Sequence, residues 1–397
     1  MNKSISSNNN LSLLHAIRGI AAFYVVIYHA KFILWSGGRE YISQYPRSTW
    51  GLTDYLSFAV DMLFSAGSQM VMIFFVLSGF FIASSFKNLT GSLAEKAKTF
   101  YTVRIIRIYI PYLASIAVGV TVLFWVQKIS PELFQLNTHR EFNNRLIAAA
   151  NDTSFSSFLK ALLFEKNTEY IGFNYAYWSL LYEGIFYLIV PVLYLFRKQY
   201  LLLSGIFYIA GMFIINIYHP ENPFVKFLFE YNFYFAVGQA IYYRKAQLSQ
   251  LLSLRNYKWR LAGACIGLFL LFNVLALAEA HFWANFLSVI TGSLLMLLFM
   301  NYQMKNSLFI RGIKYLGKIS YSLYLVHIPT LVLTYTIFYK FTGKIIFYSH
   351  IYYVGVLASV AVAVVFYKIG EEPSLKLIGK VKALFKEPAS NAQTALA

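Results

Sequence analysis

Long hydrophobic blocks constrain the fold of this 397-residue chain more than any other feature. Blocks of about 18–25 largely apolar residues recur from one end of the chain to the other, and each is long enough to cross a bilayer as an α-helix. Only 13% of the residues are charged, whereas soluble domains have roughly 25%. The chain is therefore predicted to be an all-α, polytopic membrane protein.

Ten membrane-spanning helices are predicted around a polar intramembrane cavity. A shorter apolar stretch, Tyr55–Ala66, is interrupted by Asp61 and is expected to lie at the interface or to re-enter the membrane. Residues 1–10 form a polar N-terminus, residues 11–373 the membrane domain, and residues 374–397 a basic and then disordered tail. The predicted spans are Leu11–Trp35, Gln69–Phe86, Ile105–Gln127, Phe173–Phe196, Tyr200–Tyr218, Phe224–Tyr243, Trp259–Ala278, Phe282–Tyr302, Ile319–Tyr339 and Ile351–Ile369.

The positive charges predict the orientation of these spans. The formal net charge is +18, and the basic residues cluster in every second loop, as in the segments 87–104 and 244–260. In contrast, the segment 128–169 has five basic and five acidic residues. Because basic loops stay in the cytoplasm, both termini are predicted to be cytoplasmic. Orientation signals and anionic lipid headgroups account for the clusters, so no nucleic-acid partner is expected.

The single cysteine excludes some kinds of site. Cys265 lies inside a hydrophobic block. One cysteine supports neither a disulfide framework nor a cysteine-based metal centre. No metal site is predicted.

The first span carries two residues that are costly in lipid, Arg18 and His29, within "LHAIRGIAAFYVVIYHA" (residues 14–30). A separation of eleven residues is three helical turns plus about 20°, so both side chains share one face, about 16 Å apart along the axis. An arginine in the membrane costs from about 3 to more than 10 kcal/mol. The arginine could extend to the headgroups and the histidine bond to a neighbouring helix, but the pair on one face favours a functional role.

Two further motifs follow in the second and third spans. Ser78 and Gly79 in "FFVLSGFFI" would let a helix or a ligand approach the backbone closely, with ordinary helix packing as the alternative. Arg104 and Arg107 in "RIIRIYIPY" are neighbours on one helix face. Two guanidiniums suit the phosphate groups of a ligand because each binds oxygens in a fork. Anchoring of the positive loop is the alternative.

Motifs in the fourth and ninth predicted spans add ionisable residues at membrane depth. Glu183 in "WSLLYEGIFYL" is the only acidic residue of its span, and Trp178 and Ser179 precede it. A carboxylate there must be protonated, paired or in a wet cavity, and a buried ion pair that joins two helices is the structural alternative. His327 lies in "ISYSLYLVHIP" of the ninth span. Glu371 closes the last span and is interpreted as a helix stop rather than a site.

In this order, the R-x10-H pair and the four motifs resemble the acyltransferase-3 family of bacterial integral membrane acyltransferases, from about Leu11 to Pro373. His15 departs from the pattern, because the family often has Asp there, and no SGNH esterase-like domain is appended. The resemblance implies a membrane O-acyltransferase of the bacterial inner membrane. It would transfer an acyl group, usually acetyl, from cytoplasmic acyl-CoA to a hydroxyl of a surface-glycan precursor such as an O-antigen sugar. No permanently bound cofactor is implied.

The resemblance also implies roles for residues. His29 would be the general base, since a neutral imidazole can accept the hydroxyl proton, and Glu183 would orient His29 as the carboxylate of a dyad. Arg18 would stabilise the oxyanion or the pyrophosphate, and Arg104 and Arg107 would hold the CoA phosphates. Further pocket residues are predicted to be Ser78, Gly79, Trp178, Ser179 and His327.

Several alternatives stay open at the level of sequence. A transporter or flippase of a lipid-linked sugar would also need buried charges and a cavity, and so would a non-catalytic protein that binds a glycolipid. Candidate nucleophiles such as Ser78 and Ser179 do not distinguish direct transfer from an acyl-enzyme intermediate. The expected partners are acyl-CoA, a lipid-linked or periplasmic glycan and membrane lipids, and no oligomeric state is predicted.

Overall fold

Helices make up 84% of the computed structural model, which describes residues 2–136, 138–152, 154–253, 257–302 and 307–385 and contains no strand in these ranges. The α-helices are α1 Asn2–Leu34, α2 Gly38–Gln44, α3 Leu52–Met62, α4 Gly67–Lys87, α5 Leu93–Ile129, α6 Glu141–Asn151, α7 Phe155–Leu162, α8 Trp178–Leu195, α9 Tyr200–Tyr218, α10 Pro223–Lys226, α11 Asn232–Ser253, α12 Lys258–Leu277, α13 His281–Asn301, α14 Leu308–Thr342, α15 Tyr352–Phe366 and α16 Glu372–Leu384. The all-α fold is confirmed.

Eight of the described helices are long and apolar enough to cross a membrane, which confirms a polytopic membrane protein but not the count of ten. Helices also occupy the other two predicted positions. The apolar part of α9, Tyr200–Ile215, is shorter than a span. The sixth predicted span is divided among α10, the π-helical segment Phe227–Tyr231 and α11, whose second half is polar. The predicted basic tail begins with α16, and residues 386–397 lie outside the described ranges.

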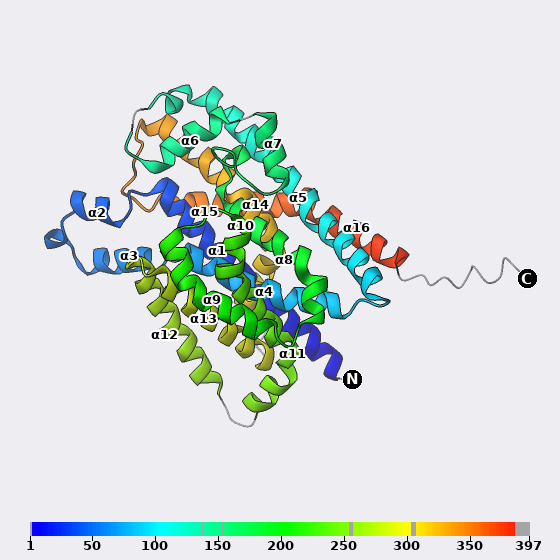
Figure 1. Cartoon of the computed structure of the whole chain (residues 1–397). Helices are drawn as coiled ribbons and strands as arrows, with labels where there is room; N and C mark the ends of the chain where they lie inside the picture. Colours follow the sequence, from blue (N-terminus) through cyan, green and yellow to red (C-terminus); the bar gives the residue numbers. More distant parts are fainter. Residues whose placement is uncertain (1, 137, 153, 254–256, 303–306, 386–397) are drawn as a thin grey trace, which may run out of the picture.

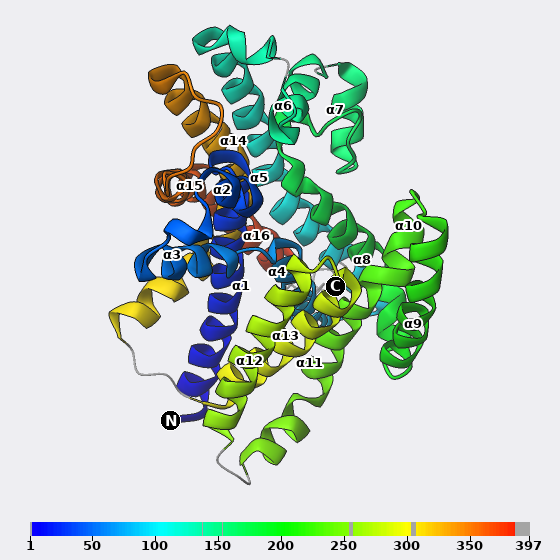
Figure 2. The same ribbon diagram turned by 90° about the vertical axis from the view of Figure 1, so that its left-hand side faces the viewer.

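The helices form one bundle with α1 and α14 side by side near its centre (Figures 1 and 2). The short helices α2 and α3 follow the end of α1, and α6 and α7 follow the end of α5. We call this side of the bundle the loop end. The opposite side, where α1, α5 and α14 begin, we call the basic end, because it carries the lysines and arginines of segments 87–104 and 311–318.

Two glycines bring α1 and α14 into backbone contact. A Cβ atom placed on Gly19 would lie 2.3 Å from the backbone nitrogen of Gly317, and one placed on Gly317 would lie 2.4 Å from the carbonyl oxygen of His15. Only residues without a side chain permit this approach. The contact fixes the segment of α1 that carries His15 and Arg18 against α14.

Gly79 has the same role between α4 and α11. A Cβ atom on Gly79 would lie 2.0 Å from the carbonyl oxygen of Phe235, and one on Gly238 would lie 1.8 Å from that of Val76. Of the two roles that the sequence left open for Gly79, this contact supports helix packing. Gly79 is a packing residue that brings α4 and α11 together.

The third predicted span begins twelve residues too late, because α5 starts at Leu93. Ser92 and Glu95 form a capping box: the Glu95 carboxylate accepts from the Ser92 backbone N–H at 2.7 Å, and the Ser92 hydroxyl accepts from the Glu95 N–H at 3.4 Å. The S-x-x-E pattern was a sequence signal for this start. As a result, Arg104 and Arg107 lie within α5 rather than at its first turn.

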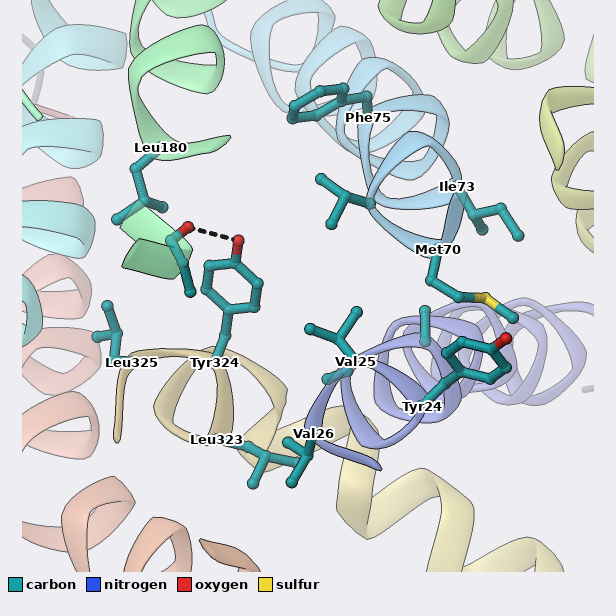
Figure 3. Close-up of a cluster of buried hydrophobic side chains, with 14 of the residues drawn as sticks. Tyr24, Val25, Val26, Met70, Ile73, Phe75, Leu180, Leu323, Tyr324 and Leu325 are labelled. Carbon is teal, nitrogen blue, oxygen red and sulfur yellow. Dashed lines mark hydrogen bonds between the residues drawn. The ribbon is translucent and has the colours of Figure 1, made fainter. Parts of the chain in front are cut away.

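Buried apolar side chains pack together in the middle of the bundle. Figure 3 shows Val25 and Val26 of α1, Ile73 and Phe75 of α4, and Leu180 of α8 in this cluster, together with Leu323 and Leu325 of α14. In α14, Pro329 leaves the carbonyl oxygen of Leu325 without a helical donor. The Asn174 side chain donates to this oxygen at 2.6 Å, so α14 continues through the proline.

Candidate active site

A cavity of about 310 Å³ at the basic end collects five of the ten predicted site residues. It lies among α1, α4, α5, α8, α14 and α16. Its charged side chains are Arg18, Arg104, Arg107, Lys382 and Glu183, so cations outnumber the single carboxylate. The remaining lining residues are His15, Ser78, Phe81, Ile82, Ser85, Val103, Ile108, Tyr187, Tyr321, Leu375 and Ile378. A cationic cavity of this size can hold phosphate groups.

Two of these arginines have unused hydrogen-bonding capacity. The Nε atoms of Arg18 and Arg104 are buried and have no partner in the described part of the chain. The Arg104 guanidinium stacks on the rings of Phe100 and Tyr187, with its central carbon 5.3 Å from each ring centre. Stacking fixes the plane of the guanidinium and leaves its edge for an anion.

Among the residues described, Glu183 lines this cavity and is not hydrogen-bonded to His29. Its Oε1 atom accepts a hydrogen bond from the Ser78 hydroxyl at 3.0 Å and a short one from the Tyr187 hydroxyl. Arg18 lines the same cavity. Within the described residues no hydrogen bond joins Glu183 to His29. The structure therefore does not bring together the predicted Glu183–His29 dyad: the carboxylate lies in the cavity at the basic end, which His29 does not line.

A second cavity, of about 270 Å³, adjoins the first, and Arg18 and Arg107 line both. Its carboxylate is Glu371, which is only 3% exposed. Glu371 accepts from both the backbone N–H and the hydroxyl of Ser322, at 3.1 and 2.6 Å. The interpretation of Glu371 as a helix stop is wrong, because a π-helical turn (Tyr367–Glu371) carries the chain on into α16.

A narrow space continues from Arg18 toward the middle of the bundle. It measures about 30 Å³, and Ser78, Glu183, Ser179 and Tyr324 line it. The hydroxyls of Ser179 and Tyr324 are 2.7 Å apart at its inner end. A space of this volume holds about one water molecule. Ser78 and Ser179 thus line the same narrow space, together with the apolar residues Phe75 and Leu180.

His29 and His327 meet beyond this narrow space, toward the loop end. Their ring centres are 5.3 Å apart. His327 Nδ1 lies 2.8 Å from the carbonyl oxygen of Tyr324, a geometry in which Nδ1 donates and Nε2 is left as an acceptor. The Nδ1 atom of His29 and the Nε2 atom of His327 are buried without a partner in the described ranges. Two nitrogens in this state can bind the hydroxyl group of a substrate.

The predicted pair of Arg18 and His29 is therefore divided between two places. Each cavity described above that includes Arg18 lacks His29. Trp178 does not line these cavities either: its ring packs on Phe75 and Tyr231, with centres 6.3 and 5.8 Å apart. The prediction of Trp178 as a pocket residue is not supported by this geometry.

Residues of the loop end pack beside His29, and no sequence motif indicated this contact. The ring of Tyr175 lies 5.0 Å from that of His29, and the Arg145 guanidinium stacks on Tyr175 at 4.7 Å. Glu169 holds Arg145 in a fork, with contacts of 2.7 and 3.0 Å, and this hydrogen bonding raises the pKa of Arg145. Asp152, at the end of α6, has a perturbed pKa. Burial alone would raise the pKa of the Asp152 carboxyl, but hydrogen bonds from two side chains and two backbone N–H groups outweigh burial and lower it to about 2.

The end of α1 is held by Arg140, which the sequence did not single out. Its guanidinium donates to the carbonyl oxygens of Phe32, Ile33 and Trp35 at 3.2, 2.8 and 3.3 Å, and it also donates to that of Ile345. Such carbonyls lack partners at a helix C-terminus, and a cation there is favourable. Arg140 thereby fixes the last turn of α1, one turn beyond His29.

No group of three or more histidine, cysteine, aspartate or glutamate side chains is arranged to hold a metal ion in the described ranges. Comparison with known proteins identifies the family. Residues 12–368 match the acyltransferase domain that defines the acyltransferase-3 family. Neither a curated protein nor a solved structure matches the chain. Because the matched domain covers nearly the whole chain and the helices are those of a multi-pass membrane protein, the chain is a membrane acyltransferase of the acyltransferase-3 family.

Proposed function

We propose that the protein transfers an acyl group, most simply acetyl, from acyl-CoA to a hydroxyl of a surface-glycan precursor such as an O-antigen sugar. The observation that carries the proposal is the cationic cavity at the basic end, from which a narrow and partly polar space continues into the bundle as far as Ser179 and Tyr324. The phosphates of the donor would lie on Arg104 and Arg107. Its flexible pantetheine arm would extend past Ser179 and Tyr324, which must separate to admit it.

In the transfer step, an imidazole nitrogen of His29 takes the proton of the acceptor hydroxyl as its oxygen attacks the thioester carbonyl. The C–O bond forms and the C–S bond breaks. The imidazolium then returns the proton to the departing thiolate. Arg18 lies about 16 Å along α1 from His29, so its role in this proposal is to bind the phosphates of the donor and not the oxyanion.

The proposal also includes the location of the protein. The basic end would face the cytoplasm, where acyl-CoA is made, and the loop end would face the periplasm of a bacterial inner membrane. Both termini would be cytoplasmic. The abundance of lysine and arginine at the basic end supports this orientation. Reporter fusions after Lys96 and after Asn151 test it, with cytoplasmic and periplasmic signals expected, and the inverse result would overturn it.

Purified protein, labelled acetyl-CoA and an extract of lipid-linked glycans test the reaction. Transfer of the label to the glycan supports the proposal. Movement of glycan across a vesicle membrane without label transfer would instead support a flippase. No label on the glycan, with donor binding intact, would contradict the proposed reaction.

A further inference from the structure

A third large cavity, of about 680 Å³, opens at the loop end of the bundle, and nothing in the transfer mechanism above uses it. It is enclosed by the end of α1, the chain from Ser36 to Arg47, α3 and the start of α6. Tyr28 and Phe32, which flank His29 on α1, both line it. The ring of Tyr28 lies 5.1 Å from that of His29. The cavity is therefore adjacent to the proposed general base, on the side opposite the donor. Its volume lies in the range of small-molecule sites, roughly 300–1,000 Å³.

The charges of this cavity are unbalanced. Four cationic side chains line it (Lys31, Arg39, Arg47 and Arg140) and one carboxylate, Glu141. Glu141 lies 3.7 Å from Arg145, which takes up part of its charge.

Two of the four cations are already engaged with the protein. Lys31 donates to the carbonyl oxygens of Asp61 and Phe64, and Arg140 donates to carbonyls at the end of α1. The other two differ. The guanidiniums of Arg39 and Arg47 make no hydrogen bond or ion pair within the described part of the chain, and both side chains are exposed.

The walls of the cavity supply aromatic surface and one unused donor. Phe32, Trp35 and Phe58 line it. Trp35 is 3% exposed, and its buried Nε1–H has no partner in the described ranges. A buried donor without a partner is rare and indicates a ligand atom or water. Aromatic faces pack on the C–H faces of sugar rings, and an indole N–H donates to a hydroxyl or an acid oxygen.

We propose that this loop-end cavity binds the acceptor and selects an anionic sugar, one that carries a carboxylate or a phosphate. Arg39 and Arg47 hold the acid group in charge-assisted hydrogen bonds, and the aromatic wall holds the ring. The acceptor hydroxyl then lies toward Tyr28 and His29. That the site binds the acceptor rests on the proposed function. The preference for an anion can be measured by binding alone.

Saturation-transfer NMR on the full-length protein tests the preference without any turnover. The protein is placed in nanodiscs of zwitterionic phosphatidylcholine, so that no anionic headgroup competes. The probes are methyl glucoside, methyl glucuronide and glucose phosphate. Wild-type protein is expected to bind at least one of the two acidic probes about tenfold or more tightly than the glucoside. The stronger of the two identifies the acid as carboxylate or phosphate.

Three variants locate the preference. The single substitutions Arg39→Ala and Arg47→Ala should each weaken binding of the acidic probe about tenfold. The double variant should bind all probes with the same affinity. Lys344→Ala removes an exposed cation of the same end outside the cavity and should behave as wild type. Arg47→Lys keeps the charge and should keep part of the preference.

Equal binding of neutral and acidic probes by the wild type would overturn the inference, and so would a preference that survives in the double variant. Both arginines are exposed and unpaired, so the variants should fold, which melting temperatures verify. Acetyl-CoA binding, measured on the same samples, should be unchanged in the double variant. If the protein binds the acidic probes through Arg39 and Arg47 but transfers no acyl group, the proposed reaction fails and the anionic site stands.

Discussion

Arg104 and Arg107 are three residues apart on α5 but differ in their surroundings, and this difference predicts different consequences when each is removed. Both line the cationic cavity. Arg104 also stacks on Phe100 and Tyr187, whereas no such ring contact of Arg107 occurs among the described residues. Arg104→Ala should therefore weaken both donor binding and the fold. Arg107→Ala should weaken donor binding only.

The magnitudes follow from the contacts. A charge-assisted hydrogen bond to phosphate contributes about 1.5–3 kcal/mol, so either alanine variant should raise the Kd for acetyl-CoA roughly ten- to hundredfold. A cation–π contact contributes about 0.5–2 kcal/mol, so Arg104→Ala should also lower the free energy of unfolding by about 1–4 kcal/mol for its two rings. Lysine at either position should restore binding only in part, because the planar fork is lost.

Calorimetric titration of acetyl-CoA into the purified protein measures the first effect, and thermal unfolding in the same detergent measures the second. An unchanged Kd in the double alanine variant would refute the donor site and leave the pair as an orientation signal. Equal melting temperatures for the two single variants would refute the stacking argument for Arg104.

Three further predictions concern the scaffold. Arg140→Met should lower the free energy of unfolding by about 3 kcal/mol, because carbonyls at the end of α1 lose a charged donor, and an unchanged melting temperature would contradict this capping role. Asp152 has a folded pKa of about 2 against an ordinary 3.8, so the stability that its carboxylate contributes is present above about pH 4 and is lost as the pH falls toward 2. Asp152→Asn should remove that part of the acid sensitivity in unfolding scans from pH 5 to 2. Identical acid profiles of the variant and the wild type would exclude this contribution. Gly79→Leu should prevent accumulation of folded protein, because its Cβ would lie 2.0 Å from a carbonyl oxygen of α11. Gly263→Leu, where the space around the Cβ is open, should fold normally. Equal yields of the two variants would contradict the close packing at Gly79.

Local patterns predicted the helices well and their ends less well. Hydrophobic length sufficed to place a helix at all ten predicted positions. It failed at the start of α5, where Ser92 and Glu95 extend the helix through a polar segment. It also failed at Glu371, which looked like a helix stop because Pro373 follows. A π-helical turn, which has no simple sequence pattern, carries the backbone through that point.

The sequence suggested candidate site residues but not which of them lie together. Helical periodicity placed Arg18 and His29 on one face of α1, and it could not show that His29 does not line the cavities that Arg18 lines. Pairing of Glu183 with His29 was a choice among partners on different helices. Tyr187 binds the carboxylate from one turn further along α8, but only the packing of α4 against α8 shows that Ser78 binds it as well. The proximity of His29 and His327 arises from the contact of α1 with α14, which no local pattern encodes.

In the proposed reaction, His29 is the general base for acyl transfer to a glycan. The substitution His29→Gln keeps the volume and a polar end but cannot accept a proton at neutral pH. Mass spectrometry of the surface glycans from cells that carry either form, with protein levels matched, tests the claim directly. Because a positioned base contributes about 10²–10⁴-fold, we expect the mass increment of the acyl group with the wild type and almost none with the variant. Undiminished acylation in the variant would show that His29 is not the general base.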